Sequence, residues 1–172
     1  MQRILLVFAG VVLLALPAAG AARADHQPAK IGYLVVRDAS ADGGVRGSAV
    51  ATVAVHGFVL GRIAQEGVVQ LYHVGSTVSP QVTGVGVSRR PVTYHHVPGF
   101  EFSGSGFRFR AVGGVWRVVV FGSGVSLYAG GEGKVTLHGE ASYPNGDGDY
   151  SLNGGHFTSL PAGHVSGTLG AK

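Results

Sequence analysis

Apolar residues alternate with polar or small ones in short runs along most of the chain. The runs are rich in valine, and no stretch of ten or more residues has the spacing of an amphipathic helix. Twelve segments show the strand-like pattern: residues 31–37, 48–55, 58–64, 68–74, 92–97, 107–112, 115–121, 125–129, 134–138, 149–152, 155–158 and 164–169. The pattern predicts an all-β fold, an antiparallel β-sandwich or barrel of about 10–12 short strands.

Glycine separates these segments. The chain has 30 glycines among its 172 residues, and glycine between valine-rich runs favours tight turns over helices. Asn153-Gly154 is a typical two-residue hairpin turn, and Gly113-Gly114 can take the same positive φ angles. We therefore predict a hairpin at each of these two dipeptides.

An internal repeat is visible at a shift of 56 residues. Residues 57–72 lie over residues 113–128, so that Gly57 matches Gly113 and Tyr72 matches Tyr128. This similarity predicts a duplicated three-strand unit, with copies at about 47–75 and 103–131. The alternative is that any β chain rich in valine and glycine matches itself at some shift.

The predicted hairpin at Gly113-Gly114 sorts its residues onto two faces. Directly opposed residues of a hairpin share a face, which places Ala111 opposite Trp116 and Arg110 opposite Arg117. The face expected to be buried consists of Phe107, Phe109, Ala111, Trp116, Val118 and Val120. The other face carries the arginines and is expected to be exposed.

These arginines are the candidate binding residues. Arg108, Arg110 and Arg117 would form one patch, and guanidinium groups suit carboxylates and phosphates. The patch would then bind an anion, such as a group on a cell-wall polymer. The alternative is an ordinary solvated face on which the arginine stems cover neighbouring valines.

The first 24 residues have the pattern of a secretory signal. Arg3 precedes the apolar residues 4–16, and Ala22-Arg23-Ala24 matches a small-residue cleavage site. We predict a signal peptide at 1–24, a lead-in at 25–29 and a single β domain at 30–172. Thirteen apolar residues are short for a membrane span, so a secreted protein without a stable span is expected, with an uncleaved anchor as the alternative.

Charge and composition exclude several functions. Removing Arg3 and Arg23 with the signal would lower the formal net charge from +4 to +2, so nucleic acid is not an expected partner. The chain has no cysteine, which excludes thiol nucleophiles, thiolate metal sites and a lipid anchor on a cysteine. No cofactor is expected.

Catalytic and metal-binding patterns are weak. Asn145, Asp147 and Asp149 alternate like the first ligands of a calcium loop, but Tyr150 stands where the loop needs glycine. The eight histidines are scattered, although folding could bring some together. Glu101 lies between two phenylalanines, which could raise its pKa, or it is the outward residue of an alternating strand. No nucleophile elbow or carboxylate pair marks an enzyme.

The segments GSAVATVAVHGFVLGRIAQEGVVQLYHVG and GSGFRFRAVGGVWRVVVFGSGVSLYAGGEGKVTLHG resemble a group of small secreted Gly/Val-rich β proteins of high-GC Gram-positive bacteria. The resemblance covers residues 45–155 and rests on the rhythm of turns and strands. It implies an exported β domain and brings no activity or site residue with it.

These observations favour a non-catalytic exported β domain with a structural or binding role at the cell surface or outside the cell. Two alternatives stay open. One is a secreted hydrolase whose site is assembled only in the fold, and the other is a calcium- or glycan-binding module.

Overall fold

The computed structural model describes residues 31–40, 47–75, 78–139 and 148–170, so the predicted signal peptide and lead-in lie outside the described residues. No helix occurs in these ranges, and the all-β prediction is confirmed. The strands are β1 (Gly32–Ala39), β2 (Ala51–Val74), β3 (Gln81–Thr83), β4 (Ser88–Tyr94), β5 (Val97–Gly122), β6 (Val125–His138), β7 (Asp149–Leu152), β8 (Thr158–Ser159) and β9 (His164–Leu169).

All nine strands belong to one antiparallel sheet. Its order is β3-β5-β2-β6-β1-β7-β8, with β4 paired to β5 and β9 paired to β6. Across the described residues the sheet has two ends and is not closed into a barrel. Within the described part of the chain, no helix is available that could cross a membrane.

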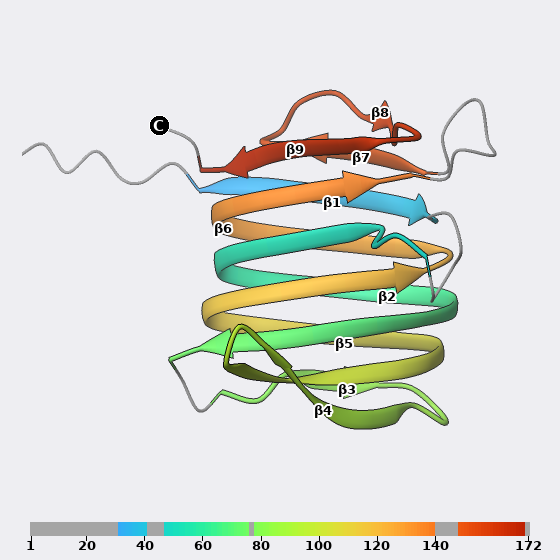
Figure 1. Cartoon of the computed structure of the whole chain (residues 1–172). Coiled ribbons are helices and arrows are strands. Elements are labelled where there is room, and N and C mark those ends of the chain that lie inside the picture. The colour runs from blue at the N-terminus through green and yellow to red at the C-terminus, as the bar shows by residue number, and fades with distance from the viewer. Residues whose placement is uncertain (1–30, 41–46, 76–77, 140–147, 171–172) are drawn as a thin grey trace, which may run out of the picture.

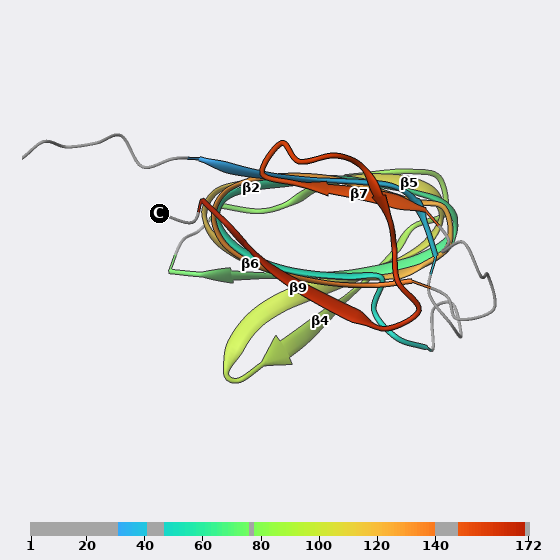
Figure 2. The same ribbon diagram turned by 90° about the horizontal axis from the view of Figure 1, so that it is seen from above.

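The sheet is wound into a flattened coil. Strands β2 and β5 are 24 and 26 residues long, and Figure 1 shows them running around the molecule from one side to the other. Seen from above, the strands form an oval ring with two long sides (Figure 2). We call the side containing β1 and residues 58–63, 107–112 and 125–130 the first layer.

The opposite side, the second layer, contains residues 67–74, 115–122 and 133–138 together with β9. The pairing of β2 with β5 connects the two layers. Residues 58–63 of β2 pair with 107–112 of β5 in the first layer, whereas residues 67–74 of β2 pair with 115–122 of β5 in the second. Each long strand therefore contributes to both layers.

The prediction of 10–12 short strands is wrong because several predicted strands are parts of one long strand. Residues 48–55, 58–64 and 68–74 fall in or beside β2, and residues 107–112 and 115–121 both lie in β5. The glycines between them do not reverse the chain. They let a strand bend from one layer to the other while its ladder of hydrogen bonds continues.

Gly113 and Gly114 show this difference clearly. Their φ angles are 77° and 80°, as the hairpin prediction required, but the flanking residues Val112 and Val115 pair with β2 and not with each other. The predicted hairpin is therefore wrong. Two positive φ angles fit a tight turn and a bend equally well, and the partner strand decides between them.

The chain reverses instead where a strand was predicted. Residues 92–97 contain the turn that joins β4 to β5, and Tyr94 pairs with Val97 across it. The two turn residues, His95 and His96, have φ angles of 44° and 66°. The dipeptides that mark such turns in a sequence are Asn-Gly, Asp-Gly and Gly-Gly, so the turn rules do not select two adjacent histidines.

The core lies between the two layers. All six residues of the predicted buried face are at most 3% exposed: Phe107, Phe109, Ala111, Trp116, Val118 and Val120. The prediction succeeded although its turn was wrong, because the two bend residues shift the inward positions from odd-numbered to even-numbered residues, and a two-residue turn makes the same shift. Trp116 is fixed further by its indole N–H, which donates to the carbonyl of Gly113 at 2.7 Å.

The Asn153-Gly154 turn is present as predicted. Both residues have positive φ, and the N–H of Gly155 donates to the carbonyl of Leu152 at 3.0 Å. The duplication stays a prediction, although both copies place a glycine, Gly57 or Gly113, where a long strand bends.

A candidate anion-binding groove

The outer face of the first layer carries an ordered set of arginines. Arg62 of β2 lies directly opposite Arg108 of β5, and one row further along the strands Leu60 lies opposite Arg110. Outward side chains in neighbouring strands are about 5 Å apart. Like charges placed directly opposite one another destabilise a sheet unless solvent or an anion compensates.

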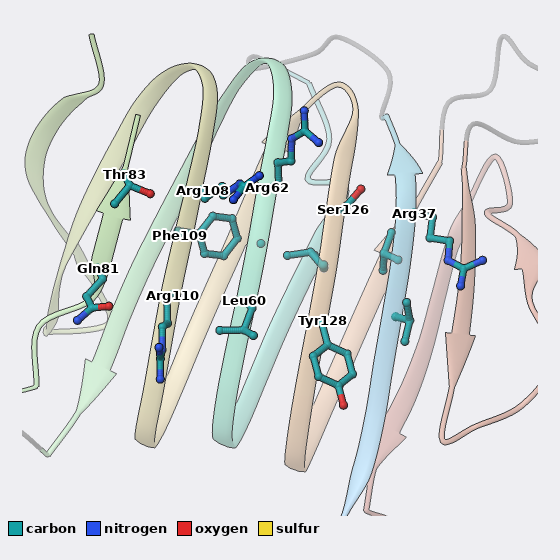
Figure 3. Close-up of a pocket in the computed structure, with 14 residues that line it drawn as sticks. Arg37, Leu60, Arg62, Gln81, Thr83, Arg108, Phe109, Arg110, Ser126 and Tyr128 are labelled. Carbon is teal, nitrogen blue, oxygen red and sulfur yellow. The ribbon is translucent and has the colours of Figure 1, made fainter. Parts of the chain in front are cut away.

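These side chains border an open groove with a volume of about 550 Å³. Figure 3 shows the groove crossing the strands, with Arg108 and Arg110 toward one end and Arg37 toward the other. The remaining outward lining residues that the structure describes are Val35, Leu60, Arg62, Gln81, Thr83, Ser126 and Tyr128. The groove is therefore lined by cations, neutral hydrogen-bonding groups and one exposed aromatic ring.

A glycine in β2, Gly61, lies in the floor of the groove. A Cβ added to Gly61 would overlap the ring of Phe109, which occupies the space beneath this residue. Phe109 itself is only 3% exposed. The ring of a core residue thus fills the space on the inner side of Gly61, where a side chain would otherwise point.

The groove has an excess of positive charge. Arg37, Arg62, Arg108 and Arg110 are all exposed. Between the residues that the structure describes, there is one ion pair, and it joins Arg90 to Glu101 elsewhere on the molecule. The four groove arginines therefore have no described carboxylate as a salt-bridge partner, and a polyanion could approach all of them from solvent.

Arg37 is held in place by an aromatic contact. Its guanidinium carbon lies 3.7 Å from the centre of the Phe157 ring. Asp38, the next residue, accepts a hydrogen bond from the Ser126 hydroxyl at 3.5 Å and lies beside the groove. This end of the groove is therefore less purely cationic than the end formed by Arg62, Arg108 and Arg110.

Three aromatic side chains cluster beside the arginines on the same face. The rings of Tyr33 and Tyr128 are parallel to within 2°, with centroids 6.0 Å apart, and the Phe58 ring is 5.3 Å from Tyr128. Gly130 of β6 is paired with Tyr33 on one side and Phe58 on the other, and a Cβ on Gly130 would overlap the Phe58 ring. Both tyrosines are 40% exposed, so their rings are available to a ligand.

The structure brings two of the three predicted arginines together. Arg108 and Arg110 border the groove, but Arg117 lies in the second layer, where it pairs with Ala54 and Tyr72. The predicted pairing of Arg110 with Arg117 is wrong, because the chain bends between them and does not reverse. The guanidinium carbon of Arg117 lies 4.0 Å from the centre of the Tyr94 ring.

Sequence reasoning missed Arg37, Arg62 and Tyr128. Arg62 stands in a predicted strand, where alternation alone marks it as an outward residue. Its position opposite Arg108 depends on which strands pair and in which register. No local pattern in the sequence carries that information.

The calcium candidates are not brought together by any described contact. Asn145 and Asp147 lie outside the described residues, and Asp149 on β7 accepts a hydrogen bond from the Ser159 hydroxyl at 3.3 Å. In the ranges that the structure covers, no three side chains of the metal-ligand types His, Cys, Asp and Glu come close enough to hold an ion. The rings of His138 and His164 approach to 4.6 Å, but they are only a pair.

Glu101 lies in the second layer and is fully engaged. It is 7% exposed and accepts hydrogen bonds from Arg90 Nε at 2.7 Å and from Gln70 Nε2 at 2.9 Å. The hydrogen bond from Arg90 lowers the pKa of Glu101, burial opposes this effect, and Gln70 adds to it. Of the two interpretations of Glu101, the one with a raised pKa is therefore wrong, because a cation from β4 outweighs the apolar neighbours.

Tyr72 is the next member of this chain of hydrogen bonds. Its hydroxyl donates to Gln70 Oε1 at 3.0 Å, and its pKa is raised by burial and by the nearby charge of Glu101. Arg90, Glu101, Gln70 and Tyr72 thus form a chain that fastens β4 to the body of the sheet. The carboxylate is engaged by structural partners and is not poised for catalysis.

Comparison with known proteins gave no match to a family model, a curated protein or a solved structure.

Proposed function

We propose that this chain is an exported, non-catalytic binding domain that recognises an anionic polymer at the cell surface through the arginine groove. The observation that carries the proposal is the alignment of four exposed arginines along one open groove, with no described carboxylate pairing to them. An extended polyanion could meet several guanidinium groups at once, and each contact would be charge-assisted.

Export is supported by the sequence. The charged and apolar pattern of residues 1–24 and the small-residue motif at Ala22-Arg23-Ala24 are typical of a secretory signal. A cysteine-free β domain is also indifferent to the oxidising conditions outside the cell. An anionic polymer of the cell wall would be accessible to such a protein.

Binding is favoured over hydrolysis by the chemistry of the groove. Its described lining residues include no carboxylate, imidazole or thiol that could act as general acid, base or nucleophile. Glu101, the most buried acid that the structure describes, is engaged by Arg90 and Gln70 in the other layer.

The proposal is tested by removing two groove cations. Polygalacturonate is a suitable probe, because it carries a carboxylate on every sugar and can be immobilised for biolayer interferometry. We expect Arg62→Ala with Arg108→Ala to raise the Kd at least tenfold, because two charge-assisted contacts are lost. Binding by the unaltered protein should weaken as salt is added.

The matched control removes two positive charges from the second layer, by Arg117→Ala with Lys134→Ala. Lys134 is exposed and pairs with Ala54 and Thr168, on the side of the molecule away from the groove. This control should retain its affinity. Equal losses in the two double variants would show that only net charge matters and would overturn the groove as the site.

A further inference from the structure

We infer that the anionic ligand of the groove is a glycan, one of whose sugar rings packs on Tyr128 while its acidic groups reach the arginines. This inference rests on the proposed function and narrows the class of ligand. It follows from where Tyr128 lies, from the orientation of its ring and from the neutral polar residues beside the arginines.

Tyr128 and the arginines belong to one continuous surface. Leu60 pairs with Tyr128 on one side and with Arg110 on the other, so these three outward residues form a row across three strands. Two strand spacings, about 10 Å, separate the ring from the arginine. A ligand that contacts both must be an extended molecule and not a single small anion.

The ring of Tyr128 is presented as a platform. Figure 3 shows it nearly face-on from outside the layer, beside Leu60. Tyr33 is parallel to it within 2°, and Phe58 supports it from the side. The face of an aromatic ring carries partial negative charge and attracts the weakly positive C–H groups of a sugar.

Neutral polar groups accompany the cations. Gln81 lies opposite Arg110, and Thr83 lies opposite Arg108, with all four side chains exposed. A polymer that offered only phosphates could accept hydrogen bonds from the amide N–H and the hydroxyl, but it would offer no donor to the amide oxygen of Gln81. A glycan supplies hydroxyl groups next to its acidic groups and can use both kinds of residue.

A single-stranded nucleic acid also combines rings with negative charges, but it fits these observations less well. Such sites stack successive bases on several aromatic faces along a strongly basic track. Here the aromatic residues are gathered at one point, and Phe58 is tilted by 53° against Tyr128. One stacked ring followed by acidic and hydroxyl groups is the pattern expected for a glycan.

The test replaces the platform and leaves the cations in place. We expect Tyr128→Ala to weaken binding to polygalacturonate at least fivefold, whereas Tyr128→Phe, which keeps the ring, stays within twofold of the unaltered protein. Binding to polyphosphate, which has charge but no sugar, should not change in Tyr128→Ala. Tyr94→Ala is the matched control, since Tyr94 is 37% exposed on β4 and lies outside the groove.

The outcomes separate this inference from the function on which it rests. If the variant lacking Arg62 and Arg108 loses binding while Tyr128→Ala keeps it, the arginine groove stands and the glycan inference is wrong. If an oligodeoxythymidylate binds more tightly than polygalacturonate, and loses affinity in Tyr128→Ala, the ligand is a nucleic acid and the inference is overturned. Circular dichroism of each variant shows that the sheet is intact.

Discussion

At the scale of single residues, the side chains of Arg90 and Glu101 show how charge is used to hold the fold together. Arg90 is 71% exposed, while the carboxylate that it contacts is nearly buried. Solvent screens the exposed partner, so the pair contributes less than its 2.7 Å distance suggests. Gln70 donates a second, uncharged hydrogen bond to Glu101. Residue 101 therefore keeps one hydrogen-bond partner when its own charge is removed.

This arrangement predicts a specific dependence of stability on pH. The pKa of Glu101 is lowered by folding, so its contribution is complete above the ordinary value of 4.5 and is lost as the pH falls below that value. Glu101→Gln should lower the free energy of unfolding by about 1 kcal/mol at pH 7. The loss should shrink as the pH is lowered toward 3.

Urea denaturation at several pH values measures this difference. Glu132→Gln is the control, since Glu132 is an exposed glutamate near a bend of β6. A constant difference between Glu101→Gln and the unaltered protein from pH 7 to pH 3 would contradict the role given to the carboxylate.

At the scale of elements, glycines at the bends allow β2, β5 and β6 to pass from one layer to the other. Gly131 of β6 lies opposite Gly57 of β2, at a point where both strands bend. Its φ angle is 139°, and a Cβ would overlap the carbonyl oxygen of His56. The bend therefore needs glycine for its backbone angle and for the close approach of two strands.

We predict that Gly131→Ala destabilises the protein by more than 2 kcal/mol, because both a disfavoured φ and an overlap with backbone result. Gly86→Ala provides the comparison. Gly86 has a φ of 68° but open space around its Cα, so about 1 kcal/mol is expected. Equal thermal shifts for the two variants would show that crowding at the bend has no effect.

Alternation along the chain was enough to predict which side chains are buried, but it could not place the bends. Phe109 and Trp116 were both assigned to the core because a two-residue turn and a two-residue bend shift the alternation by the same single position. Whether Gly113-Gly114 reverses the chain depends on Gly57, which lies 56 positions away and opposes the break. The groove could not be predicted from the sequence for the same reason, since Arg62 and Arg108 are brought together only by the pairing of β2 with β5.

At the scale of the whole molecule, the two layers share their strands. In an ordinary stack of two sheets, each layer has strands of its own, and only side chains hold the layers together. Here β2, β5 and β6 each run through both layers (Figure 1). One layer cannot separate from the other without breaking hydrogen bonds in both.

The molecule should therefore unfold in one step. Trp116 is the only tryptophan in the chain and is 1% exposed, so its fluorescence reports on the core between the layers. We predict that its transition in urea coincides with the loss of β-sheet measured by circular dichroism. A fluorescence change at clearly lower urea concentration would show that the layers open separately.

The first and last described strands lie at the same end of the coil. A Cβ on Gly32, the first residue of β1, would overlap the backbone nitrogen of Gly170, just after β9. Because the first and last described strands meet in this way, the described β domain is suitable for insertion into a surface loop of another protein. The domain, with its arginine groove, could thus be inserted into a larger protein without an added linker.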